Sequence, residues 1–599
     1  GQTKVGHMSW QPVPGNLLTR WGKKVQPDNA WQEYPRPQMV RAEWLNLNGL
    51  WDYAVTQADQ PSVPAFSGKI LVPFPLESAL SGVKRPLQPD QRLWYHRSVS
   101  LPPAWRQRRI LLHFGAADWQ AEVWVNGQKA GSHQGGYTPF WFDITAWLRD
   151  GQNELLVSVW DPTDTHWQPR GKQVLQPKSI WYTAVSGIWQ TVWLEPVPDP
   201  YIARLKLTPD LGQAALRVEF RLVGSKARQG TLRAEASDAG QVIASAQTDL
   251  SQPSLTLTIP DPQAWSPDSP HLYDLTIAIP GEQVGSYFAL RKFSLGQDTQ
   301  GRMRLCLNNQ PLFNYGPLDQ GYWPDGLYTP PSDAAMRWDL AFIKTLGCNM
   351  LRKHVKVEPA RYYYYCDQLG LIVWQDMVSG AKAVGDLPSV SAILLGYNRP
   401  DDQDYAYAGR EEPASRQNFR TELEEMVEHL YNFPCIGVWV PFNEGWGQFD
   451  ANEIASWLRQ QDPTRLIDHA SGWFDQGGGD FKSLHVYFKA LPRLKPEKER
   501  AAVISEFGGY SLKLPEHAWD AEAQFGYRKF NSPEALTGSY LRLLHKELQP
   551  LVAEGLSAAI YTQTTDVEIE MNGFITYDRE ALKMDLEKIA SVHKELIAQ

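Results

Sequence analysis

Two glutamates in the second half of this 599-residue chain follow or end apolar runs, and their settings suit acid–base or nucleophilic chemistry. Residues 436–440 form a continuous apolar run that fits a strand buried on both faces, and Asn443, Glu444 and two glycines follow it. Residues 501–510 deliver Glu506 in a similar way. A carboxylate at the carboxyl end of a buried parallel strand indicates a catalytic group in a (β/α)8 barrel. The alternative for Glu444 is a loop cap or salt bridge.

Alternating strands and helices after residue 296 would position these carboxylates. Eight strands in about 300 residues match the count and length of a TIM barrel, so a barrel is predicted over 298–599. The expected strands are 312–315, 348–352, 371–377, 435–440, 466–473, 483–488, 502–507 and 557–563, and the expected helices are 332–346, 359–369, 415–430, one from 451, and 580–597.

The first half of the chain reads as two β-domains. Residues 41–198 contain short alternating runs separated by Asn-Gly, Asp-Gly and Pro turns, which predicts a β jelly-roll sandwich. Residues 199–297 repeat the pattern over the length of an immunoglobulin-like β-sandwich, without the Cys…Trp…Cys hallmark. Residues 1–40 are expected to be a tag remnant followed by an extended lead-in.

Composition excludes some functional classes. The net charge is −9 and no basic tract is present, which argues against nucleic acid as a partner. No apolar stretch has the length of a membrane span. The four cysteines lack metal or disulfide spacing and are expected to be buried free thiols. A signal peptide is taken to have been removed, so the expected location is periplasmic or extracellular, with cytoplasmic as the alternative. The oligomeric state is left open, with a homo-oligomer as one option.

Paired carboxylates suit glycoside cleavage. The fourth and seventh strands of a barrel lie on opposite sides of its mouth, so Glu444 and Glu506 can face each other across a substrate. One carboxyl would protonate the leaving oxygen, and the other would attack the anomeric carbon or activate water.

The chain resembles glycoside hydrolase family 2, which includes β-galactosidases, β-glucuronidases and β-mannosidases. The resemblance extends from about Trp44 to the end and rests on the domain order and two motifs. Asn443-Glu444 resembles the family's Asn-Glu, whose glutamate is the acid/base. Residues 505–508, Ser-Glu-Phe-Gly, resemble the segment that carries the nucleophile.

The resemblance implies a retaining exo-β-glycosidase without a cofactor, acting on terminal β-linked sugars of oligosaccharides or glycans. It also implies that the jelly roll is sugar-binding-like. A β-galactosidase-type activity is favoured, with β-glucuronidase or β-mannosidase as alternatives. A carbohydrate-binding protein without catalysis and a transglycosylase are the rivals. The long loop at 379–413 is expected to wall the pocket and favour exo action.

Further substrate-binding candidates lie near the expected strand ends. In each case the alternative is a structural role. They are Asn443, Arg352, His354, Asp376, Trp446, Trp473, His485 and Tyr487.

The expected eighth strand departs from the family pattern, which leaves the roles of Gln563, Asp566 and Glu568 open. The family's glucuronate-binding Asn-x-Lys pair is absent. Its magnesium-ligand pattern is absent as well, so no metal site is predicted.

Overall fold

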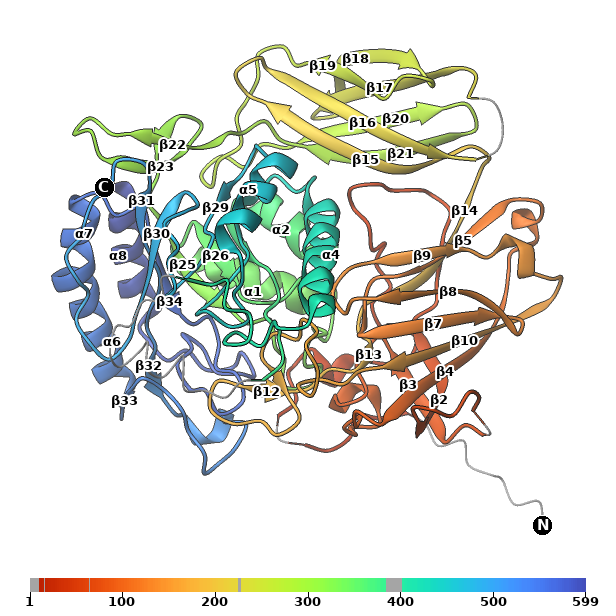
Figure 1. Ribbon diagram of the computed structural model, residues 1–599, viewed down its shortest axis with the longest axis horizontal. Helices are drawn as coiled ribbons and strands as arrows, with labels where there is room; N and C mark the ends of the chain where they lie inside the picture. The colour runs from red at the N-terminus through yellow and green to blue at the C-terminus, as the bar shows by residue number, and fades with distance from the viewer. Residues whose placement is uncertain (1–9, 16, 64, 225–227, 384–400) are drawn as a thin grey trace.

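The computed structural model describes residues 10–599 except 16, 64, 225–227 and 384–400. Figure 1 shows a barrel ringed by helices at the left, a β-sandwich at the right and a second sandwich above. The predicted fold class is confirmed. The loop at 379–413, which was predicted to form one wall of the pocket, lies in part outside the described residues, at 384–400. Within the described part of the chain, no helix is long and apolar enough to cross a membrane.

An eight-stranded parallel sheet forms the barrel, in the order β29-β28-β27-β26-β25-β34-β31-β30. Every residue of β28 is buried, as the unbroken apolar run predicts for a strand covered on both faces. The strands are β25 (Asn314–Asp319), β26 (Met350–Lys353), β27 (Ile372–Asp376), β28 (Ile436–Val440), β29 (Leu466–Ile467), β30 (Phe481–Val486), β31 (Ala501–Gly508) and β34 (Ala558–Thr562).

Helices of the barrel begin and end close to the predicted residues, with one exception. Ser332 caps α1 by accepting a hydrogen bond from the Ala335 amide at 3.1 Å. The last helix begins six residues later than predicted, because Lys583 enters a buried ion pair with Asp566 instead of continuing a helix. The helices are α1 (Asp333–Thr345), α2 (Ala360–Leu369), α4 (Pro413–Leu430), α5 (Ala451–Gln461), α6 (Pro533–Leu543), α7 (Gln549–Ala553) and α8 (Leu586–Ala598).

The jelly roll packs a six-stranded sheet, β3-β2-β4-β10-β7-β8, against a four-stranded sheet, β1-β14-β5-β9. Alternate residues of its strands point inward, so one face of each sheet builds a single apolar core. The strands are β1 (Leu45–Asn46), β2 (Gly49–Gln57), β3 (Gly68–Val72), β4 (Gln91–Ser100), β5 (Arg109–Phe114), β7 (Gln120–Val125), β8 (Gln128–Gln134), β9 (Phe140–Asp143), β10 (Gln152–Trp160) and β14 (Val192–Val197).

The second sandwich has sheets of three and four strands, β15-β16-β19 and β18-β17-β20-β21. A small antiparallel sheet, β22-β23-β24, connects it to the barrel. The cysteines at 306, 348, 366 and 435 are buried free thiols, as predicted. The strands are β15 (Tyr201–Asp210), β16 (Ala215–Val223), β17 (Thr231–Asp238), β18 (Gln241–Asp249), β19 (Ser254–Thr258), β20 (Tyr273–Ile279), β21 (Glu282–Phe288), β22 (Phe293–Gln297), β23 (Met303–Leu307) and β24 (Gln310–Pro311).

One long loop of the jelly roll, residues 161–191, packs against the barrel (Figure 1). It contains β11 (Gln173–Val174), β12 (Tyr182–Thr183) and β13 (Gly187–Ile188). Thr183 donates hydrogen bonds to the Glu568 carboxylate of the barrel at 3.0 and 3.1 Å. The jelly roll therefore supplies side chains to the same region of the barrel as the loop after β34.

Candidate active site

The backbone around each glutamate departs from regular structure. Glu444 lies beyond the end of β28 in a left-handed conformation with φ 54°, and its amide donates to the Ser471 carbonyl at 2.8 Å. Glu506 lies within β31, where the ladders to β30 and β34 shift register. Left-handed residues other than glycine are uncommon and concentrate at functional sites. Both side chains are nearly fully buried, with relative exposures of 5% and 3%.

His485 connects the two glutamates. Its Nδ1 lies 3.0 Å from Glu444 Oε1, and its Nε2 lies 3.5 Å from Glu506 Oε2. One carboxylate oxygen of each glutamate lies within 4.8 Å of the other and of a ring nitrogen of His485. The predicted pairing of the carboxylates across the barrel mouth is therefore present in the geometry.

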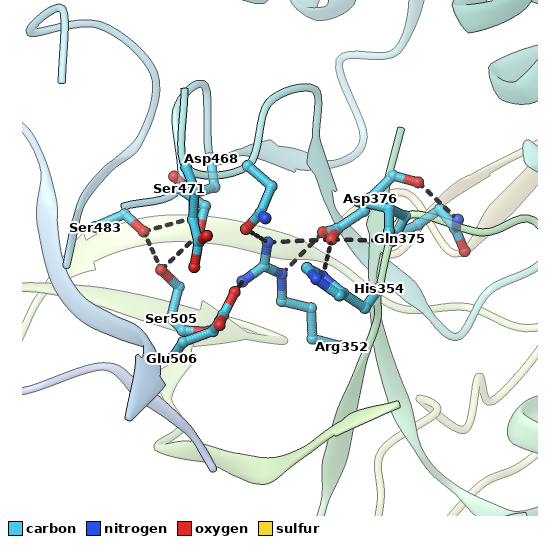
Figure 2. A network of polar contacts seen from close by, with 12 residues as sticks. Arg352, His354, Gln375, Asp376, Asp468, Ser471, Ser483, Ser505 and Glu506 are labelled. Atoms are coloured by element: carbon cyan, nitrogen blue, oxygen red, sulfur yellow. Dashed lines mark hydrogen bonds and ion pairs between the residues drawn. The ribbon is translucent and has the colours of Figure 1, made fainter. Parts of the chain in front are cut away.

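Arg352, near the end of β26, donates hydrogen bonds to several acceptors (Figure 2). It donates to both oxygens of Asp376 at 2.9 and 3.1 Å, and to Glu506 Oε2 at 3.1 Å. A further bond of 2.8 Å reaches Asn443 Oδ1. His354 Nδ1 lies 2.9 Å from the same Asp376 carboxylate. A guanidinium is suited to this task because its donors are fixed in a planar fork.

The charges around Glu506 favour its ionised form. Burial alone would raise its pKa, but the positive charges of the neighbouring histidines and Arg352, with the hydrogen bond from Tyr487, bring the pKa below its ordinary value. Burial, together with the charge of Lys172, lowers the pKa of His354 well below its ordinary value. Arg352 is a permanent cation next to Glu506, because a guanidinium stays protonated at any pH at which the protein works.

A cluster of three hydrogen-bonded serines, Ser471, Ser483 and Ser505, lies beside Glu506 (Figure 2). Ser471 Oγ lies 2.6 Å from His485 Nε2 and 2.7 Å from Ser505 Oγ. Ser483 Oγ lies 2.5 Å from Ser505 Oγ and donates to Asp468 at 2.9 Å. Sequence reasoning did not identify these serines. The only sequence clue was that Ser505 directly precedes Glu506, since the other contacts join separate strands.

Aromatic side chains surround the carboxylates. Tyr487 donates to Glu506 Oε1 at 2.5 Å and stacks on Tyr527, with ring centroids 3.8 Å apart. Trp473 packs edge-on against His485 at 5.4 Å. It lies six residues beyond the short β29, not at the end of a strand as expected. Trp446 packs against Trp181 of the jelly-roll loop at 4.8 Å.

The candidates on the loop after β34 have structural partners. Gln563 Oε1 accepts a hydrogen bond from Gln320 at 2.9 Å. Asp566 pairs with Lys583, and Glu568 accepts hydrogen bonds from Thr183. None of these three contacts Glu444 or Glu506 among the described residues. The carboxylate of this loop that does lie near the pair, Glu570, was not predicted.

A cavity of about 660 Å³ elsewhere in the molecule contains neither glutamate in its lining. It lies between the jelly roll, the lead-in and α4. Glu444, His485 and Glu506 are the one group of described residues whose ligand atoms are close enough to hold a metal ion. Their contacts with Tyr487 and Ser471 equally suit proton transfer.

Comparison with known proteins agrees with the architecture. The chain matches the glycosyl hydrolases family 2 sugar binding domain at residues 69–198, the glycosyl hydrolases family 2 model at 200–291 and its TIM barrel domain at 331–494.

Among solved structures, a β-D-glucuronidase from Dictyoglomus thermophilum has a TM-score of 0.71 at 16% identity, covering 94% of this chain and 98% of that one. A β-galacturonidase from Eisenbergiella tayi has a TM-score of 0.70 at 19% identity, covering 94% and 98%. These likenesses concern the fold.

Curated relatives carry different names. A β-galactosidase of Thermoanaerobacter pseudethanolicus is 25% identical over 62% of this chain and 48% of its own length. A putative β-glucuronidase of Formosa agariphila is 24% identical over 70% of this chain and 50% of its own length. The chain thus spans about half the length of these relatives. With all three family models matched in order along the chain and the barrel fold shared, the chain belongs to glycosyl hydrolase family 2.

Proposed function

We propose that this chain is a retaining β-glycosidase in which Glu506 is the nucleophile and Glu444 the acid/base. The observation that carries the proposal is the separation of the two carboxylates, whose nearest oxygens lie within 4.8 Å. Retaining glycosidases have carboxyl groups about 5–5.5 Å apart, whereas inverting enzymes need about 6.5–9.5 Å to admit a water molecule. The short separation therefore favours direct attack by a carboxylate.

In the first step Glu506 attacks the anomeric carbon, and Glu444 protonates the departing glycosidic oxygen. Arg352 and Tyr487 keep the attacking carboxylate ionised and aligned, because each donates to a different oxygen of Glu506. In the second step a water molecule gives a proton to Glu444 and its oxygen attacks the anomeric carbon, which breaks the bond to Glu506, releases the sugar and restores the Glu506 carboxylate. Inversion occurs in both steps, so the product keeps the anomeric configuration.

Asn443 is suited to bind the sugar next to this pair. Its Oδ1 is engaged by Arg352, which fixes the orientation of the amide. Its Nδ2 is buried and has no partner among the described residues. An unpaired buried donor is costly, and a sugar hydroxyl would satisfy it. Trp446 and Trp473 are proposed to flank the sugar ring, as expected from the sequence.

A β-galactosidase-type exo activity is our first choice of substrate, with β-glucuronidase and β-mannosidase as alternatives. The names of the relatives support β-galactosidase and β-glucuronidase activity. A binding protein without catalysis and a transglycosylase are the rivals. A panel of nitrophenyl β-glycosides separates these choices, and product analysis at high acceptor concentration detects transglycosylation.

The test is substitution of each glutamate. Glu506→Gln should lower kcat by at least about 10³-fold on all substrates, because the amide is no nucleophile. Glu444→Gln should lower kcat far more on a glycoside with a poor leaving group than on an activated aryl glycoside, whose leaving group departs without protonation. Glu453→Gln, an exposed glutamate on α5, is the control. Near-full turnover by Glu506→Gln, or an inverted product seen by NMR, would refute the assignment.

A further inference from the structure

Two buried charged side chains near the proposed site lack opposite-charge partners. Lys172 belongs to the jelly-roll loop and is 4% exposed. Its Nζ lies 4.6 Å from the ring of Trp446 and 5.3 Å from that of Trp181. No ion pair joins it to a carboxylate of the described chain. A buried ammonium held only by aromatic faces is costly unless another group completes its shell.

Glu570, on the loop after β34, is the second of these groups. It is 2% exposed, and its Oε2 is buried without a partner among the described residues. Its backbone is fixed by a bridge to Phe525 and by a hydrogen bond from its amide to Val567. The carboxylate is therefore held in place, and its unpaired oxygen is not the result of a loose loop.

A chain of aromatic contacts connects the backbone of Glu570 to the nucleophile. Phe525, the bridge partner of Glu570, packs against Tyr527 at 5.6 Å, and Tyr527 stacks on Tyr487, which binds Glu506. The pKa of Glu570 rises to about 7 because burial disfavours its charged form; the charge of Lys172 and the hydroxyl of Tyr182 oppose this rise, and the charge of Glu506 adds to it. Lys172 and Glu570 are thus near each other and near the nucleophile, yet they form no direct ion pair within 4 Å.

We propose that Lys172 and Glu570 form the sugar-recognition end of the site and select a neutral, hydroxyl-bearing glycoside over the corresponding uronide. A hydroxyl can donate to Glu570 and accept from Lys172 at the same time. A uronate carboxylate would satisfy Lys172, but beside it Glu570 must either stay ionised as a like charge or take up a proton, so the uronide should bind less well as pH rises. This assignment rests on the proposed function and narrows its substrate class.

Matched substrate pairs test the proposal directly. The 4-nitrophenyl β-galactoside and β-galacturonide, and the β-glucoside and β-glucuronide, differ only in the group at C5. At pH 8, where Glu570 is largely ionised, the wild-type protein should hydrolyse the better neutral substrate with a kcat/KM at least about 10-fold above its uronide. Glu570→Gln should lower kcat/KM on that neutral substrate by about 10–100-fold, the range expected for a hydrogen bond to a charged group, and should narrow the gap to the uronide.

Two further variants separate recognition from structure. Glu568→Gln alters a carboxylate two residues away that is occupied by Thr183, and should leave the neutral-to-uronide ratio unchanged. Lys172→Met should also lower kcat/KM on the neutral substrate, with an unchanged Tm showing that the fold persists. On a deoxy glycoside that lacks the hydroxyl bound by Glu570, the wild-type protein and Glu570→Gln should have the same kcat/KM.

The outcomes distinguish this inference from the proposed function. Preference of the wild-type protein for either uronide overturns the inference and leaves the glycosidase assignment standing. The inference is also overturned if Glu570→Gln lowers kcat/KM equally on the neutral glycoside and on its uronide. If no glycoside is hydrolysed, the proposed function fails, and calorimetry with free sugars decides recognition: tighter binding of the uronic acid than of its parent hexose would overturn the inference.

Discussion

Replacing Tyr487 by Phe would isolate one support of the nucleophile. The hydroxyl donates to Glu506 Oε1 at 2.5 Å and contacts Thr562 Oγ1 at 2.6 Å. The substitution keeps the ring, its stack on Tyr527 and the Arg352 contact, so it removes only the hydrogen bonds of the hydroxyl. Tyr487→Phe is therefore a test of how the pKa of Glu506 is held low.

The expected magnitude follows from the strength of that bond. A hydrogen bond to a charged group contributes about 1.5–3 kcal/mol, and one pKa unit equals about 1.4 kcal/mol. Losing the bond should therefore raise the pKa of Glu506 by about 1–2 units. Because the carboxylate is active when ionised and its pKa is depressed, activity is retained at neutral pH and is lost as pH falls through the raised pKa.

The assay is the pH dependence of kcat/KM on an activated aryl glycoside from pH 3 to 8. The acid limb of Tyr487→Phe should lie about 1–2 units above that of the wild-type protein. Tyr527→Phe is the matched control, because Tyr527 stacks on Tyr487 without a hydrogen bond to Glu506 among the described contacts. An unmoved acid limb in Tyr487→Phe, or an equal shift in both variants, would refute the reasoning.

Two further predictions concern stability. Arg352→Met should lower the free energy of unfolding by about 3–5 kcal/mol, because Asp376 and Glu506 lose their buried cation. Thermal unfolding measures this loss, with Arg352→Lys as the variant that keeps the charge. An unchanged Tm in Arg352→Met would contradict the prediction. Burial lowers the pKa of His593 to about 4, so its contribution to stability is present above the unfolded pKa of about 6.5 and falls as pH drops below it. Urea unfolding at pH 7 and 4.5 should show a smaller loss in His593→Gln than in the wild-type protein, by about 2–3 kcal/mol; equal losses would argue against this.

Much of the fold could be predicted because its physical causes are local. The run at 436–440 has no polar side chain, so it fits only a strand covered on both faces. Ser332 caps a helix through a contact three residues away. The late start of α8 was missed, because it depends on Lys583 pairing with Asp566, a partner on another segment. Likewise β29 is only two residues long, although the apolar pattern suggested a longer strand.

The candidate active site was predictable in part. Asn443, Arg352, His354, Asp376, His485 and Tyr487 each stand near a strand end, and the structure gathers all six around the two glutamates. The serine cluster that contacts His485 was not predictable, because serine is common and the contacts join different segments of the chain. Lys172 could not be placed either, since it comes from a β-domain about 270 residues before Glu444.

Hydrophobic periodicity and short motifs act over a few residues, so they were enough to predict the order of the domains, the existence of the barrel strands and the two glutamates. The distance between the carboxylates and the identity of the groups around them depend on tertiary packing. Lys172 and Glu570 are brought together by packing of the jelly roll on the barrel and lie almost 400 residues apart in sequence. Such contacts depend on how domains dock, and local sequence patterns carry no record of that.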